Sequence, residues 1–307
     1  MLKAAITTSS FGKYDNAPLK LCEKVGLEVI LNPHGRKVKP DELAELARNA
    51  VGIIAGTEPI TEETLLELSS LKVISRCGTG MDNVDVCCAE KMGIKVFNTP
   101  DAPTTAVAEL TIGLILSLMR KTHMMNADIK ADIWEKLMGN LLYKKKVGIK
   151  GFGRIGKRVA ELLSLFGCEI AYSDPFVEDG LLGFSNVPLE KMLGWADIVS
   201  VHVPVSEQLI GANELMLMKK GAWLLNTSRG GVIDEEKLYE LLKSGYLSGA
   251  ALDVFAEEPY KGPLKELDNV ILTPHSGSYA KESRIEMEMQ SVENLLRGLR
   301  ECNEISE

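Results

Sequence analysis

The chain has 307 residues, a formal net charge of −8 and a pI of about 5.3, with 45% hydrophobic and 25% charged residues. This length favours two domains, and the composition is typical of a soluble globular protein. A nucleic-acid-binding protein usually carries a strongly basic face, which this charge balance does not indicate.

We expect neither a secretory leader nor a membrane span. The longest apolar stretch, 110–119, contains Thr111, Gly113 and Ser117 and is too short to cross a bilayer. The six cysteines form no CxxC pair, and no His/Cys cluster has metal-ligand spacing, so no metal is expected. Scattered thiols in a chain of this size indicate a reducing compartment, and we expect a cytoplasmic protein.

Short apolar runs alternate with amphipathic, helix-length segments from the N-terminus onward. Strands are expected at 4–8, 28–31, 52–55, 72–75 and 95–98, with helices at 40–50, 61–68 and 104–121. A second series of strands is expected at 146–150, 169–173, 198–202, 223–226, 250–254 and 270–272, before a charged helix at 279–300. The alternation predicts an α/β protein with two doubly wound parallel-sheet domains. No further regulatory domain is expected after the last helix.

The strongest local signal is a strand that leads directly into Gly151-x-Gly153-x-x-Gly156. The helix that follows has one apolar face and is expected to stop at Gly167. Gly151 would permit the tight turn, Gly153 would let the backbone approach a pyrophosphate, and Gly156 would let helix and strand pack closely. Because the helix N-terminus also presents free N–H groups, the segment predicts a dinucleotide site.

Asp174 follows the next expected strand, where a carboxylate would accept hydrogen bonds from the adenosine ribose hydroxyls. An acid there also repels a 2′-phosphate, which favours NAD over NADP. Taken alone, Asp174 is also explained as the start of a turn with Pro175, but the glycine pattern beside it favours the role in cofactor binding. Lys150, the last residue of the strand before the glycine loop, is unexpected because an apolar residue is usual there. The sequence assigns it no role; snorkelling of its side chain to the edge of the site is one option.

Arg229, Glu258 and His275 each follow one of the last three expected strands. Ligands bind outside the carboxyl ends of the strands in open parallel sheets, so we expect the three side chains at one edge with the glycine loop. The Arg229 guanidinium would hold a carboxylate, and His275 would exchange a proton with a carbonyl or hydroxyl oxygen. Singly, each residue is explained as a surface charge or turn residue; together they predict a catalytic set.

The other residues expected to contact the cofactor are Arg154, Ile155, Pro175, His202, Pro204, Thr227 and Asp253. His202 lies at a strand end and is expected to line the cofactor pocket. His34 and His123 lie outside these motifs and are expected to be surface or turn residues.

In order and spacing, these segments resemble the D-isomer-specific 2-hydroxyacid dehydrogenase family, in its short, phosphoglycerate dehydrogenase-like form. Residues 75–85 look like the substrate-carboxylate loop of the family, and residues 98–109 look like its crossing into the cofactor domain. The resemblance implies that Arg229, Glu258 and His275 are catalytic. It also implies that Cys77, Gly78 and Thr79 form the substrate site, with the N–H groups of Gly78 and Thr79 on the carboxylate.

The resemblance further implies a Rossmann NAD-binding domain of residues 99–279, inserted into a flavodoxin-like substrate domain of residues 1–98 plus 280–307. It implies a homodimer with the helix around 107–120 near the contact, although the apolar run of this helix fits an interface or a core equally well. The implied reaction is NAD-dependent interconversion of a small D-2-hydroxy acid and its 2-keto acid.

Three alternatives remain at this point. The substrate could be 3-phosphoglycerate, but Glu58 stands where phosphoglycerate enzymes of the family often offer a cation. Ser276-Gly277-Ser278 also departs slightly from the usual sequence after the histidine. A corepressor-type protein that senses NAD(H) without turnover, and another enzyme on this cofactor fold such as a formate dehydrogenase, are the rival functions.

Overall fold

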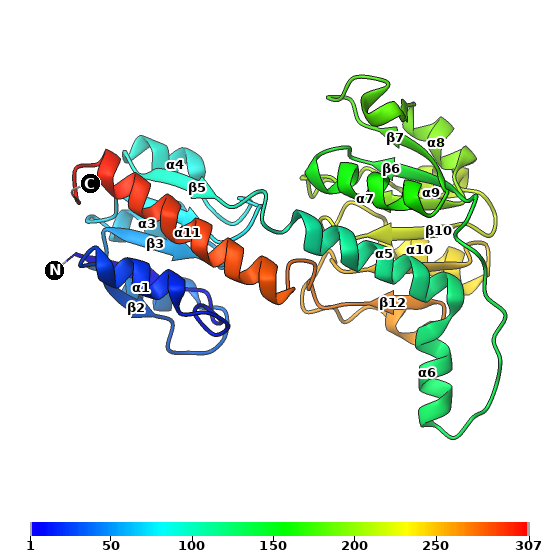
Figure 1. The fold of residues 1–307 in the computed structure, drawn as a ribbon, viewed down its shortest axis with the longest axis horizontal. Coiled ribbons are helices and arrows are strands. Elements are labelled where there is room, and N and C mark those ends of the chain that lie inside the picture. The colour runs from blue at the N-terminus through cyan, green and yellow to red at the C-terminus, as the bar shows by residue number, and fades with distance from the viewer. Residues whose placement is uncertain (1, 306–307) are drawn as a thin grey trace. The chain divides into compact units, whose positions relative to one another are not determined.

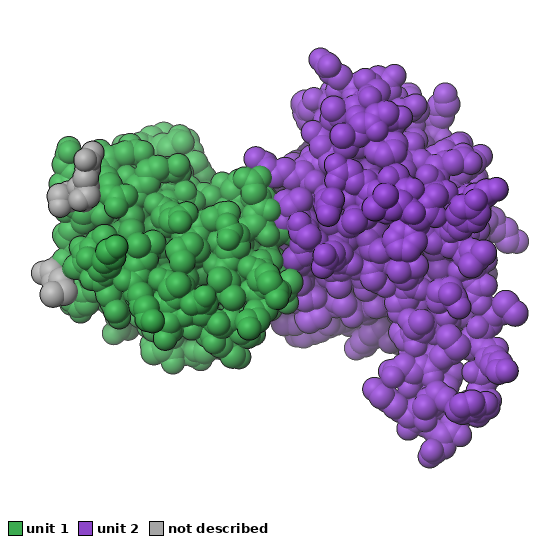
Figure 2. Space-filling model, in the orientation of Figure 1, with its two compact units in different colours: residues 1–103, 278–307 green, residues 104–277 purple. Residues whose placement is uncertain are grey.

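The structure, a computed structural model, describes residues 2–305 (Figure 1). The chain forms two compact units, residues 1–103 with 278–307 and residues 104–277, shown in green and purple in Figure 2. The sequence-based division at 98/99 and 279/280 lies close to these bounds. Each unit holds a parallel sheet with helices on both faces, which confirms the predicted α/β class.

The sheet of the first unit has the strand order β2-β1-β3-β4-β5, with every pair parallel. Its strands are β1 (Lys3–Ile6), β2 (Glu28–Leu31), β3 (Gly52–Ala55), β4 (Val73–Arg76) and β5 (Lys95–Asn98). Its helices are α1 (Ala17–Lys24), α2 (Pro40–Ala47), α3 (Glu62–Glu67), α4 (Val86–Lys91) and α11 (Lys281–Glu301). Residues of α2, α3 and α4 share one core cluster with the sheet, and residues of α1 and α11 share the cluster on the other face. The last helix of the chain therefore covers one face of a sheet whose strands all come from the first third of the chain.

The sheet of the second unit has the order β12-β11-β10-β9-β6-β7-β8, again all parallel. Its strands are β6 (Lys146–Lys150), β7 (Glu169–Ser173), β8 (Ser185–Asn186), β9 (Ile198–Val201), β10 (Trp223–Asn226), β11 (Gly249–Leu252) and β12 (Val270–Leu272). Its α-helices are α5 (Thr104–Arg120), α6 (Thr122–Lys130), α7 (Arg154–Leu165), α8 (Leu189–Trp195), α9 (Ala212–Leu217) and α10 (Glu235–Lys243), with 3₁₀ turns η1 (Leu181–Gly183) and η2 (Pro263–Glu266).

Helices α5 and α7 cover one face of this sheet, and α8, α9 and α10 cover the other. The apolar run of α5, including Leu114, Ile115 and Leu118, is buried in the core beneath it, so this run is a core face. Figure 1 shows α6 and the chain after it reaching away from the body of the unit. Within residues 2–305, no helix is long and apolar enough to cross a membrane.

Local signals in the sequence account for several element ends. Oγ1 of Thr61 accepts a hydrogen bond from the N–H of Thr64 and caps α3. Helix α7 ends at Leu165, two residues before Gly167, whose φ of +74° is left-handed. Strand β8 is not predicted by the sequence, because two residues are too few to show an alternating pattern.

Candidate active site

The glycine loop joins β6 to α7 at the carboxyl edge of the second sheet. At Gly151, where φ is +89°, a Cβ would collide with the carbonyl oxygen of His202, and at Gly156 it would collide with that of Gly151. Both positions therefore require glycine. A Cβ on Gly153, the N-cap of α7, would meet no atom within 4 Å. The backbone at Gly153 is thus open on the side from which a phosphate would approach the helix N-terminus.

Asp174 follows β7 beside this loop. Its Oδ2 accepts a hydrogen bond from the N–H of Phe152 at 2.7 Å, and its Oδ1 accepts one from the N–H of Phe176 at 2.9 Å. The carboxylate therefore joins the glycine loop to the turn after β7, with Pro175 exposed between them. Because an ionised carboxylate has about four acceptor positions, Asp174 keeps capacity for further donors.

His202 follows β9 on the other side of β6 and is 8% exposed. Its Nε2 lies 2.8 Å from Oγ of Ser200, and its Nδ1 has no hydrogen-bond partner within the described residues. Burial lowers the pKa of His202 to about 3, so the ring is neutral at pH 7. Pro204, two residues on, is exposed on the same loop.

Glu258 and His275 meet at the same edge of the sheet. Oε2 of Glu258 lies 3.0 Å from Nδ1 of His275, and Oε1 of Glu258 accepts a hydrogen bond from the N–H of Phe255 at 3.3 Å. Their side chains are 39% and 49% exposed. The pair is therefore open to a reactant while one ring nitrogen is fixed by the carboxylate.

Asp253 holds the loop that carries His275. Its Oδ1 accepts hydrogen bonds from Oγ1 of Thr273 at 2.5 Å and from the N–H of Ser276 at 2.8 Å, and its Oδ2 accepts one from the N–H of Gly277 at 2.8 Å. The carbonyl oxygen of Asp253 accepts the N–H of His275, whose φ of +52° is left-handed. Asp253 is 1% exposed, so its carboxylate serves this loop rather than an open cofactor surface.

The Arg229 loop packs against the loop that carries Glu258. A Cβ on Gly230 would collide with the carbonyl oxygen of Phe255, so only glycine fits. The side chain of Asn226 donates to the carbonyl oxygen of Arg229 at 2.8 Å and fixes the turn after β10. Thr227, an expected cofactor contact, is 6% exposed, and its Oγ1 lies 3.0 Å from that of Thr111 on α5.

One carboxylate at this edge is not revealed by the sequence patterns. Glu235, in the first turn of α10, accepts a hydrogen bond from the N–H of Ala256 through Oε1 at 2.7 Å. Burial raises the pKa of Glu235; the hydrogen bond opposes that rise, and the charge of Glu258 adds to it. An acid in a first helical turn is an ordinary helix signal, and nothing in its spacing indicates a contact with the turn before Glu258.

In the first unit, the loop after β4 carries Cys77, Gly78 and Thr79, which the sequence predicts as the substrate site. Cys77 is 2% exposed within the core, where burial raises the pKa of its thiol, so its side chain does not face a ligand. The N–H of Gly78 donates to the carbonyl oxygen of Arg76 at 2.9 Å. Of the two amides expected on the carboxylate, the N–H of Thr79 is therefore the one with no backbone acceptor within the described residues. The guanidinium of Arg76 lies over Gly78 and brings a positive charge to this loop.

Glu58 is not an open charge beside the expected substrate loop, contrary to the expectation from the sequence. Glu58 is 1% exposed, and its Oε1 accepts hydrogen bonds from the hydroxyl of Thr7 and from the N–H of Gly56. Its carboxylate therefore supports the loop after β3 and does not stand in the open. The nearby Arg76 donates to Oδ1 of Asn83 at 3.4 Å and to the carbonyl oxygen of Cys77.

The remaining expected residues divide between core and surface. Ile155 is partly buried and packs against the core under α7, whereas Arg154 is exposed. His34 is exposed, and Nε2 of His123 lies 3.1 Å from the carbonyl oxygen of Asp268. Within residues 2–305, no three His, Cys, Asp or Glu side chains group as metal ligands do.

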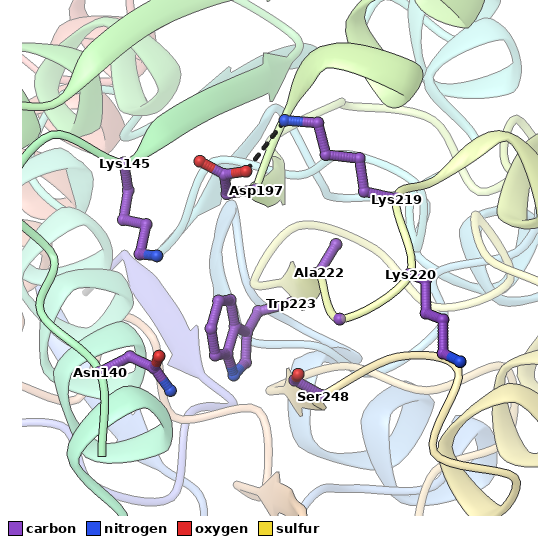
Figure 3. A pocket seen from close by; sticks show the side chains of 9 residues that line it. Asn140, Lys145, Asp197, Lys219, Lys220, Ala222, Trp223 and Ser248 are labelled. Atoms are coloured by element: carbon purple, nitrogen blue, oxygen red, sulfur yellow. Dashed lines mark hydrogen bonds and ion pairs between the residues drawn. The ribbon is translucent and has the colours of Figure 1, made fainter.

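A pocket of about 250 Å³ lies at the opposite edge of the second sheet, where β6, β9, β10 and β11 begin (Figure 3). Figure 3 shows Lys145, Lys219 and Lys220 around it, with Nζ of Lys219 2.9 Å from Oδ1 of Asp197. Because parallel strands start there, this pocket is remote from Glu258 and His275.

Known proteins are similar in sequence to this chain over most of its length. The sequence profile described as "D-isomer specific 2-hydroxyacid dehydrogenase, NAD binding domain" matches residues 112–277. The chain is 36% identical over 299 residues to a hydroxypyruvate reductase of Thermotoga maritima, covering 92% of this chain and 97% of that protein. It is 39% identical over 278 residues to a D-3-phosphoglycerate dehydrogenase of Methanocaldococcus jannaschii, covering 87% of this chain but 52% of that protein.

A solved structure has the same fold over nearly the whole length of this chain. The crystal structure of the TT0316 protein from Thermus thermophilus superposes with a TM-score of 0.92 at 34% identity, covering 98% of this chain and 97% of that one. The chain thus spans about half the length of the phosphoglycerate dehydrogenases it matches and nearly the whole of the reductase.

Proposed function

The chain belongs to the D-isomer specific 2-hydroxyacid dehydrogenase family, and we propose that it interconverts a small 2-hydroxy acid and its 2-keto acid with NAD. The observation that carries this proposal is the 3.0 Å contact between Glu258 and His275 at the sheet edge that also bears the glycine loop. A histidine held by a carboxylate is a proton donor and acceptor, which hydride transfer at a C–O bond requires.

The residues present fit the dinucleotide. The open backbone at Gly153 and the N-terminus of α7 would hold the pyrophosphate, and Asp174 would accept hydrogen bonds from the adenosine ribose. His202 and Pro204 would line the adenosine end, with the imidazole neutral. Bound NADH supplies the hydride.

His275 then moves the proton. With Nδ1 held by Glu258, Nε2 of His275 is the atom that gives a proton to the carbonyl oxygen of the keto acid, or takes one from the hydroxy acid. The carboxylate of Glu258 stabilises the protonated ring. Asp253 and Glu235 would position the loops that carry this pair.

Arg229 would hold the substrate. A guanidinium forms two parallel hydrogen bonds with a carboxylate and favours negative charge developing on a neighbouring carbonyl oxygen. The turn fixed by Asn226 and the close approach of Gly230 to Phe255 place Arg229 on the loop beside Glu258.

The substrate we propose is an unphosphorylated keto acid such as hydroxypyruvate or glyoxylate. The full-length match to a hydroxypyruvate reductase supports this choice, whereas the phosphoglycerate dehydrogenases are matched over about half their length. In the loop after β3, which is Gly56-Thr-Glu-Pro59, no cation is present, and the guanidinium of Arg76 is engaged by Asn83 and Cys77. The Thermotoga and Methanocaldococcus relatives are named as a reductase and a dehydrogenase, and neither as a corepressor.

The test is NADH oxidation followed at 340 nm with pyruvate, hydroxypyruvate, glyoxylate, 2-oxoglutarate and 3-phosphohydroxypyruvate. We expect turnover of a short unphosphorylated acid, abolished in His275→Ala. Equal or better turnover of 3-phosphohydroxypyruvate would overturn the substrate choice. NADH binding without turnover of any acid would overturn the enzymatic proposal.

We also propose a cytoplasmic homodimer that associates through α6 and the segment after it. Trp134, Met138 and Leu141 in that segment are 85%, 86% and 68% exposed. Three large apolar side chains exposed within eight residues are typical of a surface that another protein covers. The scattered spacing of the six cysteines supports a reducing compartment. Light scattering after gel filtration should give twice the chain mass, and Trp134→Ser with Met138→Ser should give the monomer. Leu165→Ser, at a residue 84% exposed on α7, is the control and should leave a dimer.

A further inference from the structure

Lys150 brings a positive charge to the adenosine end of the proposed cofactor site. It is the last residue of β6 and only half-buried, and within the described residues its ammonium makes no hydrogen bond or ion pair. Burial of such a lysine in the centre of a parallel sheet opposes its charge. Its ammonium is therefore a candidate partner for a negative group on a ligand.

The strand register places Lys150 between two residues assigned to the cofactor. It pairs with Ser173 of β7 and with Val201 of β9, so Asp174 and His202 follow directly on either side. Its carbonyl oxygen accepts the N–H of His202 at 2.7 Å, which fixes this arrangement at the carboxyl edge.

The side chain of Lys150 leaves the sheet on the face covered by α8. Side chains alternate along a strand, and Gly148, two residues earlier, faces α8, since a Cβ there would lie 2.7 Å from Cγ of Met192. The charges that act on Lys150 agree with this direction. Burial lowers the pKa of Lys150, and the carboxylates of Asp174 and then Glu190, on α8, raise it.

We propose that Lys150 forms a subsite for the 2′-phosphate of the adenosine ribose, so that the protein binds NADPH as well as NADH. This inference rests on the proposed placement of the dinucleotide at the glycine loop. Asp174 alone would repel a 2′-phosphate, and a neighbouring ammonium offsets that repulsion and supplies a charge-assisted donor.

The experiment is isothermal titration of the full chain with NADH and with NADPH, without any keto acid. We expect the NADPH dissociation constant to lie within about tenfold of the NADH value, and Lys150→Met to widen this ratio by about tenfold or more. Lys150→Arg should keep the ratio of the original protein, because it keeps the charge. Lys191→Met removes a lysine from the solvent side of α8 and should leave the ratio unchanged.

Three results would overturn the inference, and they are distinguishable from failure of the proposed function. Tight NADH binding with NADPH weaker by more than about 100-fold removes the subsite but keeps the enzyme. The same is true if Lys150→Met weakens both nucleotides equally, or if Lys191→Met changes the ratio as much. Failure to bind either nucleotide would instead remove the placement of the dinucleotide itself.

Discussion

Oε2 of Glu258 lies 3.0 Å from Nδ1 of His275, while Oε1 of the same carboxylate accepts the N–H of Phe255. One carboxyl group therefore ties the imidazole to the backbone of the turn that follows β11. In the proposed reaction, this leaves Nε2 as the ring nitrogen that meets the substrate, and it makes the charge of Glu258 part of the proton transfer.

Glu258→Gln should lower kcat for keto-acid reduction by about 100-fold, because the amide keeps the shape of the contact but not the charge that stabilises the protonated ring. The NADH dissociation constant should stay within about twofold, since this contact is not made with the nucleotide. Steady-state kinetics and titration provide the two readouts. Glu257→Gln, at the exposed neighbour, is the control; an equal loss there would point to the turn and not to the carboxylate.

Arg229→Lys should lower kcat/KM for the keto acid by about 100-fold or more, because an ammonium cannot reproduce a bidentate hold on a carboxylate. The loss should include a raised KM. Arg48→Lys, at an exposed arginine of the first unit, should leave both constants unchanged. Wild-type kinetics in Arg229→Lys would exclude a bidentate contact with the substrate.

Asp253→Asn should destabilise the protein by about 1–3 kcal/mol, because an amide nitrogen cannot accept from the N–H of Gly277 or Ser276 in a buried place. It should also reduce kcat, since the left-handed turn at His275 loses its support. Urea unfolding and kinetics measure the two effects. Asp268→Asn, at an exposed aspartate, is the matched control. Full activity with unchanged stability would show that the loop around His275 keeps its conformation without the carboxylate of Asp253.

His202 should make folding sensitive to acid. Its folded-state pKa is about 3, below its ordinary value of 6.5, so between these values the unfolded chain binds a proton that the folded chain excludes. Stability from this group is complete above 6.5 and falls as the pH drops toward 3, by at most about 1.4 kcal/mol per pH unit. His202→Gln should lose less stability than the original protein between about pH 7 and pH 5 in urea unfolding. His34→Gln, at an exposed ring, should track the original protein; equal acid sensitivity in His202→Gln would contradict the assignment.

Apolar runs locate every described strand except β8, because buried parallel strands carry a local signal, and the glycine spacing marks the loop after β6. The spacing of residues cannot show which way a side chain faces once the sheet is assembled. Position in a motif places Cys77 and Glu58 at a ligand, but the first side chain lies in the core and the second supports a loop. The close approach of Gly230 to the carbonyl oxygen of Phe255 joins segments that are distant in sequence, and no local pattern encodes it.

Helix α11 has a consequence for how the protein is made. Leu295 and Leu299 of this helix fill the sheet face formed by Ile54 and Val73, and residues 104–277 are synthesised between the two segments. On the ribosome, the second unit therefore has all its strands available while one face of the first sheet is covered by α1 but still lacks α11. The domain that starts first is completed last, so a nascent chain arrested before residue 281 presents a hydrophobic surface that chaperones would bind.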